Sequence, residues 1–205
     1  MKTGSAHAAG DEACDSPNYR PYFPFVTLKC VGRPVFRSRE ARNYACLLDL
    51  DPSVVSWRCL TYALADNHGP KRYYVDFFVE KVDEHLLVEV CDRDPGNTEW
   101  IRILAEQFEC RYQAVLMSAI RSQPRLQNAK DLLRYAGYEA ALGDRIRILA
   151  ALDELGSLTL AECLSAVRDG RPMQTVAAMI LTGHIEVELD EELLRPDTTV
   201  RRASR

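Results

Sequence analysis

The sequence lacks a membrane-spanning segment: no run reaches the roughly eighteen consecutive apolar residues that a transmembrane helix needs. The first twenty residues are small and polar, and they also lack the apolar centre of a signal peptide. We therefore expect residues 1–20 to be a disordered lead-in, and we expect a cytoplasmic protein without membrane contact.

The seven cysteines and four histidines lack the close spacing of a metal site, and no CxxC pair occurs among them. An odd number of scattered cysteines is typical of reduced thiols in a cytoplasmic protein, not of a disulfide framework. The same scatter argues against a zinc site, which needs ligands at short, regular spacing.

The chain also lacks an excess of positive charge: 26 Lys and Arg against 30 Asp and Glu give a net charge of −4. Because many nucleic-acid-binding proteins are basic overall, any contact with DNA has to come from a local patch or from a partner. One basic run fits this requirement, although a solvated helix face explains it equally well; it consists of Arg121, Arg125, Lys130 and Arg134.

What the sequence does contain is the pattern of an α/β protein. Ser38 is a candidate N-cap, and apolar residues follow it at helical spacing. Three β-rich segments come next, at 54–65, 71–80 and 85–91. A helix from Thr98, a strand over 111–117 and a helix over 126–135 complete a first domain, which we place at residues 21–137.

The character of the sequence changes between Gly137 and Gly143, where we expect a domain boundary. The pattern predicts helices over 144–155, 159–168 and 172–182, then paired strands over 184–189 and 198–202. Three helices followed by a hairpin are typical of a small winged-helix domain, here residues 143–205. This part has 8 basic and 11 acidic residues, which favours a protein partner over DNA, while the terminal arginines leave DNA binding open.

Two carboxylates stand within the apolar strands, at Asp76 and Glu89. A buried carboxylate is costly unless it is paired or binds a metal, and Mg²⁺ prefers carboxylate and carbonyl oxygens. Asp76, Glu89 and the carbonyl of Val90 are therefore candidate ligands of a metal that acts in phosphodiester hydrolysis. The alternatives are a structural carboxylate at Asp76 and a glutamate that faces water at Glu89.

Tyr74-Val-Asp76-Phe-Phe, followed by Leu87-Val-Glu89-Val-Cys91, resembles the core of the PD-(D/E)xK nucleases. The resemblance extends to the TnsA-type transposon endonucleases over roughly residues 21 to 202. Ser38-Arg-Glu40-Ala-Arg-Asn-Tyr44 is similar to that family's first helix, and residues 120–135 are similar to its closing segment. The resemblance implies a restriction-endonuclease-like mixed sheet flanked by helices, and some members also carry a C-terminal winged helix.

Carried over residue by residue, the resemblance makes Glu40, Asp76 and Glu89 ligands of Mg²⁺ or Mn²⁺. Glu40 alone is also explained by the preference of acidic residues for the first turn of a helix. The family's activity implies nicking of the 5′ ends of a transposon, beside a transposase subunit and an ATPase regulator. Three positions depart from the family pattern. Val75 replaces a proline, the family's glutamine would fall near Cys59, and Cys91 replaces the lysine.

The cysteine at position 91 leaves two other interpretations open. Loss of one preorganised charge typically lowers the rate by about 10²–10³, so the chain is alternatively an inactive nuclease fold that serves DNA binding or assembly. Cys91 itself is better explained as a small apolar residue than as a nucleophile. A third interpretation is a winged-helix regulator with a dimerising first domain. Candidate replacement cations are Lys71, Arg72, Arg93 and Arg102.

Overall fold

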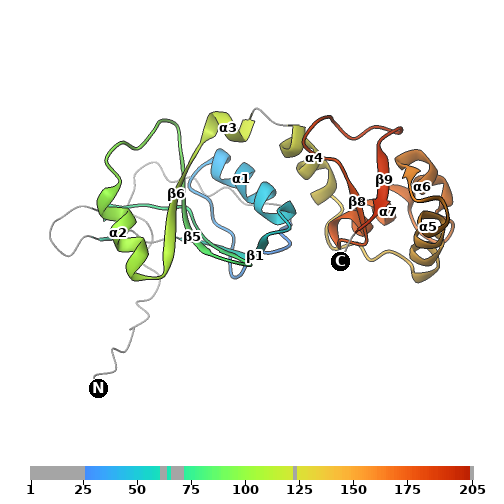
Figure 1. The fold of residues 1–205 in the computed structure, drawn as a ribbon, viewed down its shortest axis with the longest axis horizontal. Coiled ribbons are helices and arrows are strands. Elements are labelled where there is room, and N and C mark those ends of the chain that lie inside the picture. Colours follow the sequence, from blue (N-terminus) through green and yellow to red (C-terminus); the bar gives the residue numbers. More distant parts are fainter. Residues whose placement is uncertain (1–25, 61–63, 66–71, 122–123, 204–205) are drawn as a thin grey trace, which may run out of the picture.

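The computed structural model describes residues 26–60, 64–65, 72–121 and 124–203, which form a mixed α/β protein of seven helices and nine strands (Figure 1). The expected lead-in at 1–20, Lys71, the side chain of Arg72 and Arg205 lie outside the described residues. Within these ranges, no helix is long and apolar enough to cross a membrane.

The first helix, α1 (Arg39–Leu50), begins where the sequence predicted. The hydroxyl of Ser38 accepts a 2.9 Å hydrogen bond from the backbone N–H of Ala41, which satisfies one of the free donors of the first turn. The helix ends at Leu50, and Asp51 is its C-cap, because the residue before Pro52 disfavours helical backbone. Ala41, Ala45 and Leu48 are buried on the face that packs on the sheet.

The central sheet has four strands in the order β1 (Val54–Cys59), β4 (Phe77–Lys81), β5 (His85–Cys91) and β6 (Cys110–Leu116). The first three are antiparallel neighbours, whereas β6 runs parallel to β5. A parallel pair needs a crossover connection, and α2 (Glu99–Gln107) supplies it. The strand predicted over 85–91 is confirmed, because β5 has these bounds.

The predicted strand over 54–65 was wrong in its length. β1 ends at Cys59, and Leu64–Ala65 forms a separate short strand, β2, that pairs with β3 (Arg72–Tyr73). The strand predicted over 71–80 is likewise divided into β3 and β4, with Tyr74–Asp76 between them. Alternating side chains do not show where a strand leaves one sheet for another.

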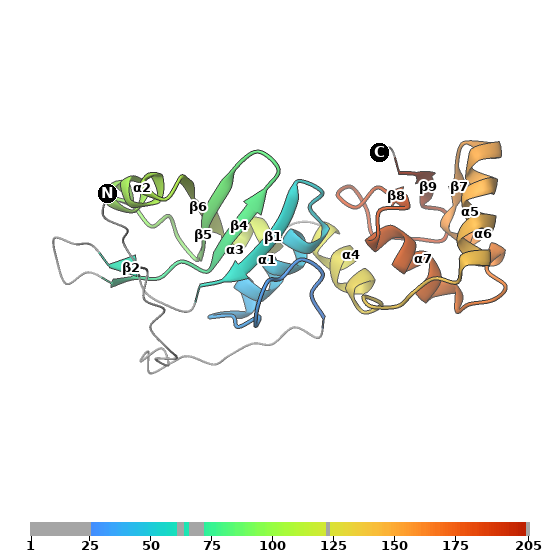
Figure 2. The same ribbon diagram turned by 90° about the horizontal axis from the view of Figure 1, so that it is seen from below.

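Two apolar layers cover the two faces of the sheet. Trp57, Phe77 and Val88 pack with α1 on one face, and Val75 and Leu87 pack with Ile101 of α2 on the other. Figure 2 shows α1 and α2 at different sides of the strands. Successive residues of β5 therefore alternate between the two layers, which decides the direction of every side chain discussed below.

Two further helices close this part of the chain, α3 (Met117–Arg121) and α4 (Pro124–Leu133). The sequence predicted one helix over 126–135; α4 begins two residues earlier and ends two residues earlier. Leu126 of α4 and Ile120 of α3 are both buried in the layer that contains α1.

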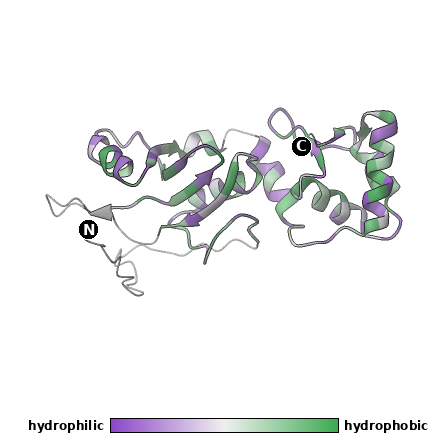
Figure 3. Cartoon of the chain, turned by 60° about the horizontal axis from the view of Figure 1, so that its bottom comes forward, coloured by the Kyte–Doolittle hydropathy of each residue, from purple (hydrophilic) through white to green (hydrophobic). Residues whose placement is uncertain are grey.

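The C-terminal part has three helices, α5 (Leu142–Leu155), α6 (Leu160–Ala166) and α7 (Pro172–Leu181), as predicted. The predicted pairing near the C-terminus is also present, between β8 (Ile185–Val187) and β9 (Thr199–Arg202). β7 (Leu158–Thr159), which was not predicted, joins the other edge of β9. These elements enclose their own apolar cluster, while hydrophobic and hydrophilic stretches alternate along the helices (Figure 3).

Among the residues of α4 that contact this C-terminal part is a buried polar side chain, Asn128. Its amide donates hydrogen bonds to the carbonyl oxygens of Leu189 (2.9 Å) and Glu192 (2.8 Å). Its own carbonyl oxygen accepts a 3.0 Å bond from the backbone N–H of Leu194. The segment after β8 is therefore held against α4 by backbone groups, a contact that depends little on the identity of the residues in that segment.

Candidate functional site

Asp76 lies at the junction of three strands, directly before β4. Its backbone N–H donates a hydrogen bond to the carbonyl oxygen of Val88 (2.8 Å), and its own carbonyl oxygen accepts one from the N–H of Leu60 (2.9 Å). Its carboxylate oxygen Oδ2 accepts a further bond from the N–H of Val90 (2.8 Å). Only 3% of this side chain is exposed. The Asp76 backbone therefore bonds both neighbouring segments. Its carboxylate bonds one backbone N–H of β5, as a structural carboxylate can.

The charge of Asp76 is balanced by Arg37, a residue that the sequence analysis missed. Its Nε lies 3.0 Å from Oδ1 and its Nη2 lies 2.8 Å from Oδ2, so the guanidinium group occupies both carboxylate oxygens. The guanidinium carbon also lies 5.8 Å from the centre of the Tyr74 ring. Arg37 stands two residues ahead of α1 and 39 positions from Asp76, and no local pattern links such residues.

Glu40, in the first turn of α1, is also buried and paired. Its Oε1 accepts from Nε of Arg121 at 2.9 Å and from Nη2 of the same guanidinium group. Its Oε2 accepts from the amide of Asn43 at 2.9 Å. Arg121 was a candidate for phosphate contact, and here its fork is fixed on a carboxylate of α1.

Glu89 is held on the α2 side of the sheet. It follows Leu87 on β5 by one strand period, and the hydroxyl groups of Tyr73 and Tyr112 both donate to its Oε2. Burial and the Glu89 carboxylate raise the pKa of Tyr73 to about 12, and the same two causes raise the pKa of Tyr112. Both tyrosines therefore remain protonated donors at neutral pH.

Cys91, at the lysine position of the resemblance, donates its thiol to the carbonyl oxygen of Val115 at 3.7 Å. Burial raises the pKa of this thiol, and the nearby charges of Glu89, Asp94 and Asp76 raise it further. Because the thiolate is the reactive form, the raised pKa disfavours a nucleophilic role for Cys91, and a thiol carries no positive charge.

The other candidate cations are engaged elsewhere or lie apart. Arg93 is almost fully exposed and lies 4.0 Å from Asp92, and Arg102 lines a hollow beside the turn between β4 and β5. Along the predicted basic run, Arg125 pairs with Asp190 (2.8 Å), Arg134 pairs with Asp131 (3.7 Å), and Lys130 is half-buried on α4.

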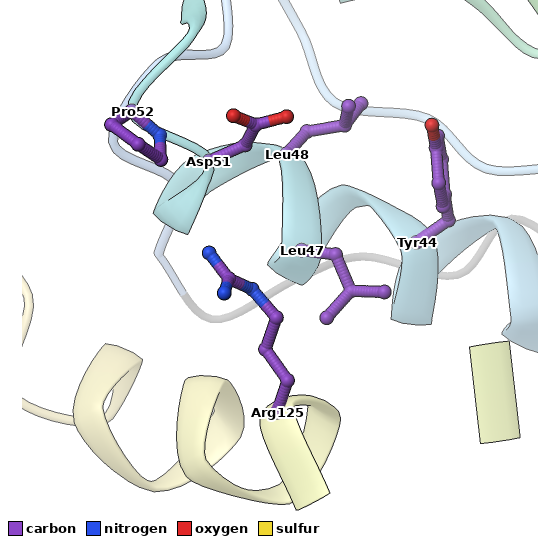
Figure 4. A pocket seen from close by; sticks show the side chains of 6 residues that line it. All are labelled: Tyr44, Leu47, Leu48, Asp51, Pro52 and Arg125. Atoms are coloured by element: carbon purple, nitrogen blue, oxygen red, sulfur yellow. The ribbon is translucent and has the colours of Figure 1, made fainter. Parts of the chain in front are cut away.

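Arg125 points toward the end of α1. Figure 4 shows it beside a cavity of about 390 Å³ that it lines with Leu47, Leu48 and Asp51, among others. Its Nη2 donates to the carbonyl oxygen of Leu50 at 3.2 Å. Two bonds to protein groups fix this guanidinium group between α1 and the segment after β8, so it is a packing residue.

The predicted metal ligands are not arranged to hold an ion. Across the described ranges, no group of three or more His, Cys, Asp and Glu side chains could hold a metal. Glu40 and Asp76 each bind an arginine, and Glu89 binds two phenols. A carboxylate that already accepts several hydrogen bonds would have to release them before it bound Mg²⁺, so these residues do not fit the ion in this arrangement.

Comparison with known proteins adds no family to these observations. No protein-family model matches the chain, and no curated protein matches it.

Proposed function

We propose that the protein is a TnsA-like, nuclease-fold subunit of a DNA-processing complex, which serves DNA binding or assembly without cutting the strand. The pairing of Arg37 with Asp76 carries this proposal. Both oxygens of the most buried candidate ligand accept from a cation of the protein itself. The thiol of Cys91, which cannot carry a positive charge, supports the same conclusion.

The element order supports the fold assignment behind this proposal. An N-terminal helix, three antiparallel strands, a crossover helix and a parallel fourth strand suit a restriction-endonuclease-like core. The helices α5–α7 and strands β7–β9 suit a winged-helix domain. Its acidic segment, which includes Glu186, Glu188 and Asp190, favours a protein partner there, and by resemblance a transposase subunit or an ATPase regulator.

A second candidate function is metal-dependent nicking of 5′ transposon ends. One observation favours it: the Asp76 carboxylate lies 2.8 Å from the backbone N–H of Val90, so the aspartate and the strand that carries Glu89 meet where the resemblance requires. In this alternative Arg37 leaves Asp76, and Asp76, Glu40 and Glu89 hold Mg²⁺ or Mn²⁺. The bound ion would polarise the scissile phosphate.

Nicking of a supercoiled plasmid separates the two candidates. Wild type, Asp76→Ala and Cys91→Lys are incubated with Mn²⁺ or EDTA, and duplex binding is measured in parallel. We expect wild type to bind DNA without nicking it. Any metal-dependent nicking is expected only in Cys91→Lys. Nicking by wild type that Asp76→Ala abolishes would support the second candidate and overturn the first.

A further inference from the structure

A cluster of arginines surrounds the beginning of α1. Residues 33–42 contain four arginines and one glutamate in a chain whose net charge is −4. Arg121 joins them from α3 by its bond to Glu40. We call Arg37, Arg39 and Arg121 the α1 arginine cluster. It is a local positive patch of the kind that an acidic protein needs in order to contact nucleic acid.

Two members of the cluster are fixed by carboxylates behind them. The Asp76 side chain is 3% exposed while that of Arg37 is 29% exposed, and the Glu40 side chain is 9% exposed while that of Arg121 is 63% exposed. Each carboxylate therefore lies beneath its arginine, on the protein side. A guanidinium group has five N–H donors, and these contacts use the Nε and Nη2 edges.

The remaining donors are preorganised for a second acceptor. An arginine that is held in one rotamer loses less entropy when it binds, and its fork matches the oxygens of a phosphate. The cost of burying Glu40 and Asp76 is offset by their arginines. The two carboxylates thus act as supports for the guanidinium groups, which explains why they stand where a metal site was expected.

Arg39 adds a charge that no carboxylate of the described residues neutralises. Its side chain is exposed, and it has no ion-pair partner within the described residues. It is the first residue of α1, a helix of 12 residues whose dipole favours anions at this end. Arg37 and Arg39 stand next to the start of α1 in the sequence, and Arg121 bonds Glu40 in its first turn. Several guanidinium groups around one helix end suit a ligand with repeated negative charge.

We infer that the α1 arginine cluster binds backbone phosphates of duplex DNA without a divalent cation. The inference rests on the proposed function, because it names the surface through which that subunit would contact DNA. It assigns to Arg37 and Arg121 the role that a metal ion has in a cleaving enzyme, which is to hold the phosphate. Glu40 and Asp76 position these arginines and do not touch the DNA.

Fluorescence anisotropy of a labelled duplex, measured in EDTA over a series of salt concentrations, tests the inference. Arg39→Gln is the principal variant, since Arg39 has no ion-pair partner to lose in the part of the chain that the structure describes. We expect several-fold weaker binding and a salt dependence that is lower by about 1 in slope, as for the loss of one phosphate contact. Arg121→Gln is expected to act in the same direction.

Arg111→Gln is the matched control, because Arg111 is an exposed arginine that is paired with Glu84 and lies outside the basic run of residues 121–134. Its binding and salt slope should equal those of wild type. Thermal melting of every variant separates loss of contact from loss of fold, and Arg37→Gln is interpreted only if its melting temperature is retained. A poly-glutamate competitor tests whether the cluster prefers an acidic protein.

Several outcomes would overturn the inference. Unchanged binding in Arg39→Gln and Arg121→Gln would do so while leaving the proposed function intact, because DNA would then bind elsewhere. Binding that requires Mg²⁺, or that poly-glutamate displaces as well as unlabelled DNA does, would also reject it. Nicking by wild type in the plasmid assay contradicts the proposed function independently of these results.

Discussion

At the scale of the residue, buried charges in this protein are held by protein groups. Asp144 is the most complete case outside the candidate site, with a fully buried side chain. It accepts backbone N–H bonds from Arg168 (2.8 Å) and Gly170 (2.8 Å), and it pairs with Arg147. Burial by itself raises the pKa of Asp144, but these bonds outweigh it, so the pKa lies below its usual 3.8.

This lowered pKa predicts acid sensitivity. The ionised form of Asp144 stabilises the fold above pH 3.8, and that contribution is lost as the pH falls below this value toward the folded-state pKa. Asp144→Asn should therefore lower the free energy of unfolding at pH 7 and weaken its dependence on pH below 3.8. Urea unfolding at several pH values measures this, with Asp153→Asn, a half-exposed carboxylate, as the control. Equal pH dependence in wild type and Asp144→Asn would contradict the assignment.

At the scale of the element, local signals predicted most boundaries well. Ser38, Pro172 and the Gly183 that follows α7 mark helix ends where the structure has them. The errors arose where pairing crosses sheets, as in residues 54–65, because a strand's partner is chosen by contacts distant in sequence. The start of α1 matters most, since it orients Arg37, Arg39 and Glu40 together.

Loss of the α1 N-cap is expected to lower the free energy of unfolding. Ser38→Ala removes the bond to the N–H of Ala41 and should cost about 1 kcal/mol of unfolding free energy, a typical value for an N-cap. Chemical denaturation measures the difference. Ser165→Ala, which removes a hydroxyl bonded within α6, is the matched control and should change stability by less. An effect of Ser38→Ala no larger than that of the control would show that the cap does not stabilise α1.

At the scale of the whole molecule, Asn128 joins the sheet-bearing part to the C-terminal helices. The side chain is 2% exposed, and its three hydrogen bonds all reach backbone groups of residues 189–194. A buried backbone group that loses its partner costs about 1–3 kcal/mol. The three hydrogen bonds of Asn128 therefore stabilise the contact between the two parts more than the partly exposed ion pair of Arg125 and Asp190 does.

Replacement of Asn128 should loosen this joint. Asn128→Ala is expected to lower the free energy of unfolding by about 2 kcal/mol or more and to speed protease cleavage in residues 189–194. Limited proteolysis with mass spectrometry locates the cuts, and denaturation gives the energy. Gln127→Ala, one position away and exposed, is the control. Cleavage that is the same in both variants would mean that Asn128 does not hold the segment.

Local sequence patterns indicated which segments are helical, which are β-rich, and that Asp76 and Glu89 are carboxylates within apolar strands. These features depend on periodicity, caps and turn residues, all of which act over a few positions. Arg121 and Arg125, by contrast, belong to the same basic run in the sequence. Only the folded structure shows that Arg125 is a packing residue, whereas the guanidinium group of Arg121 is exposed.

Only the tertiary structure decided what neutralises each carboxylate. Arg37 meets Asp76 across 39 positions, Arg121 meets Glu40 across 81, and Tyr112 meets Glu89 across 23. Electrostatic pairing depends on distance in space, and chain folding brings such residues together without leaving a local pattern. That is why the sequence indicated a metal site and the folded chain presents arginines.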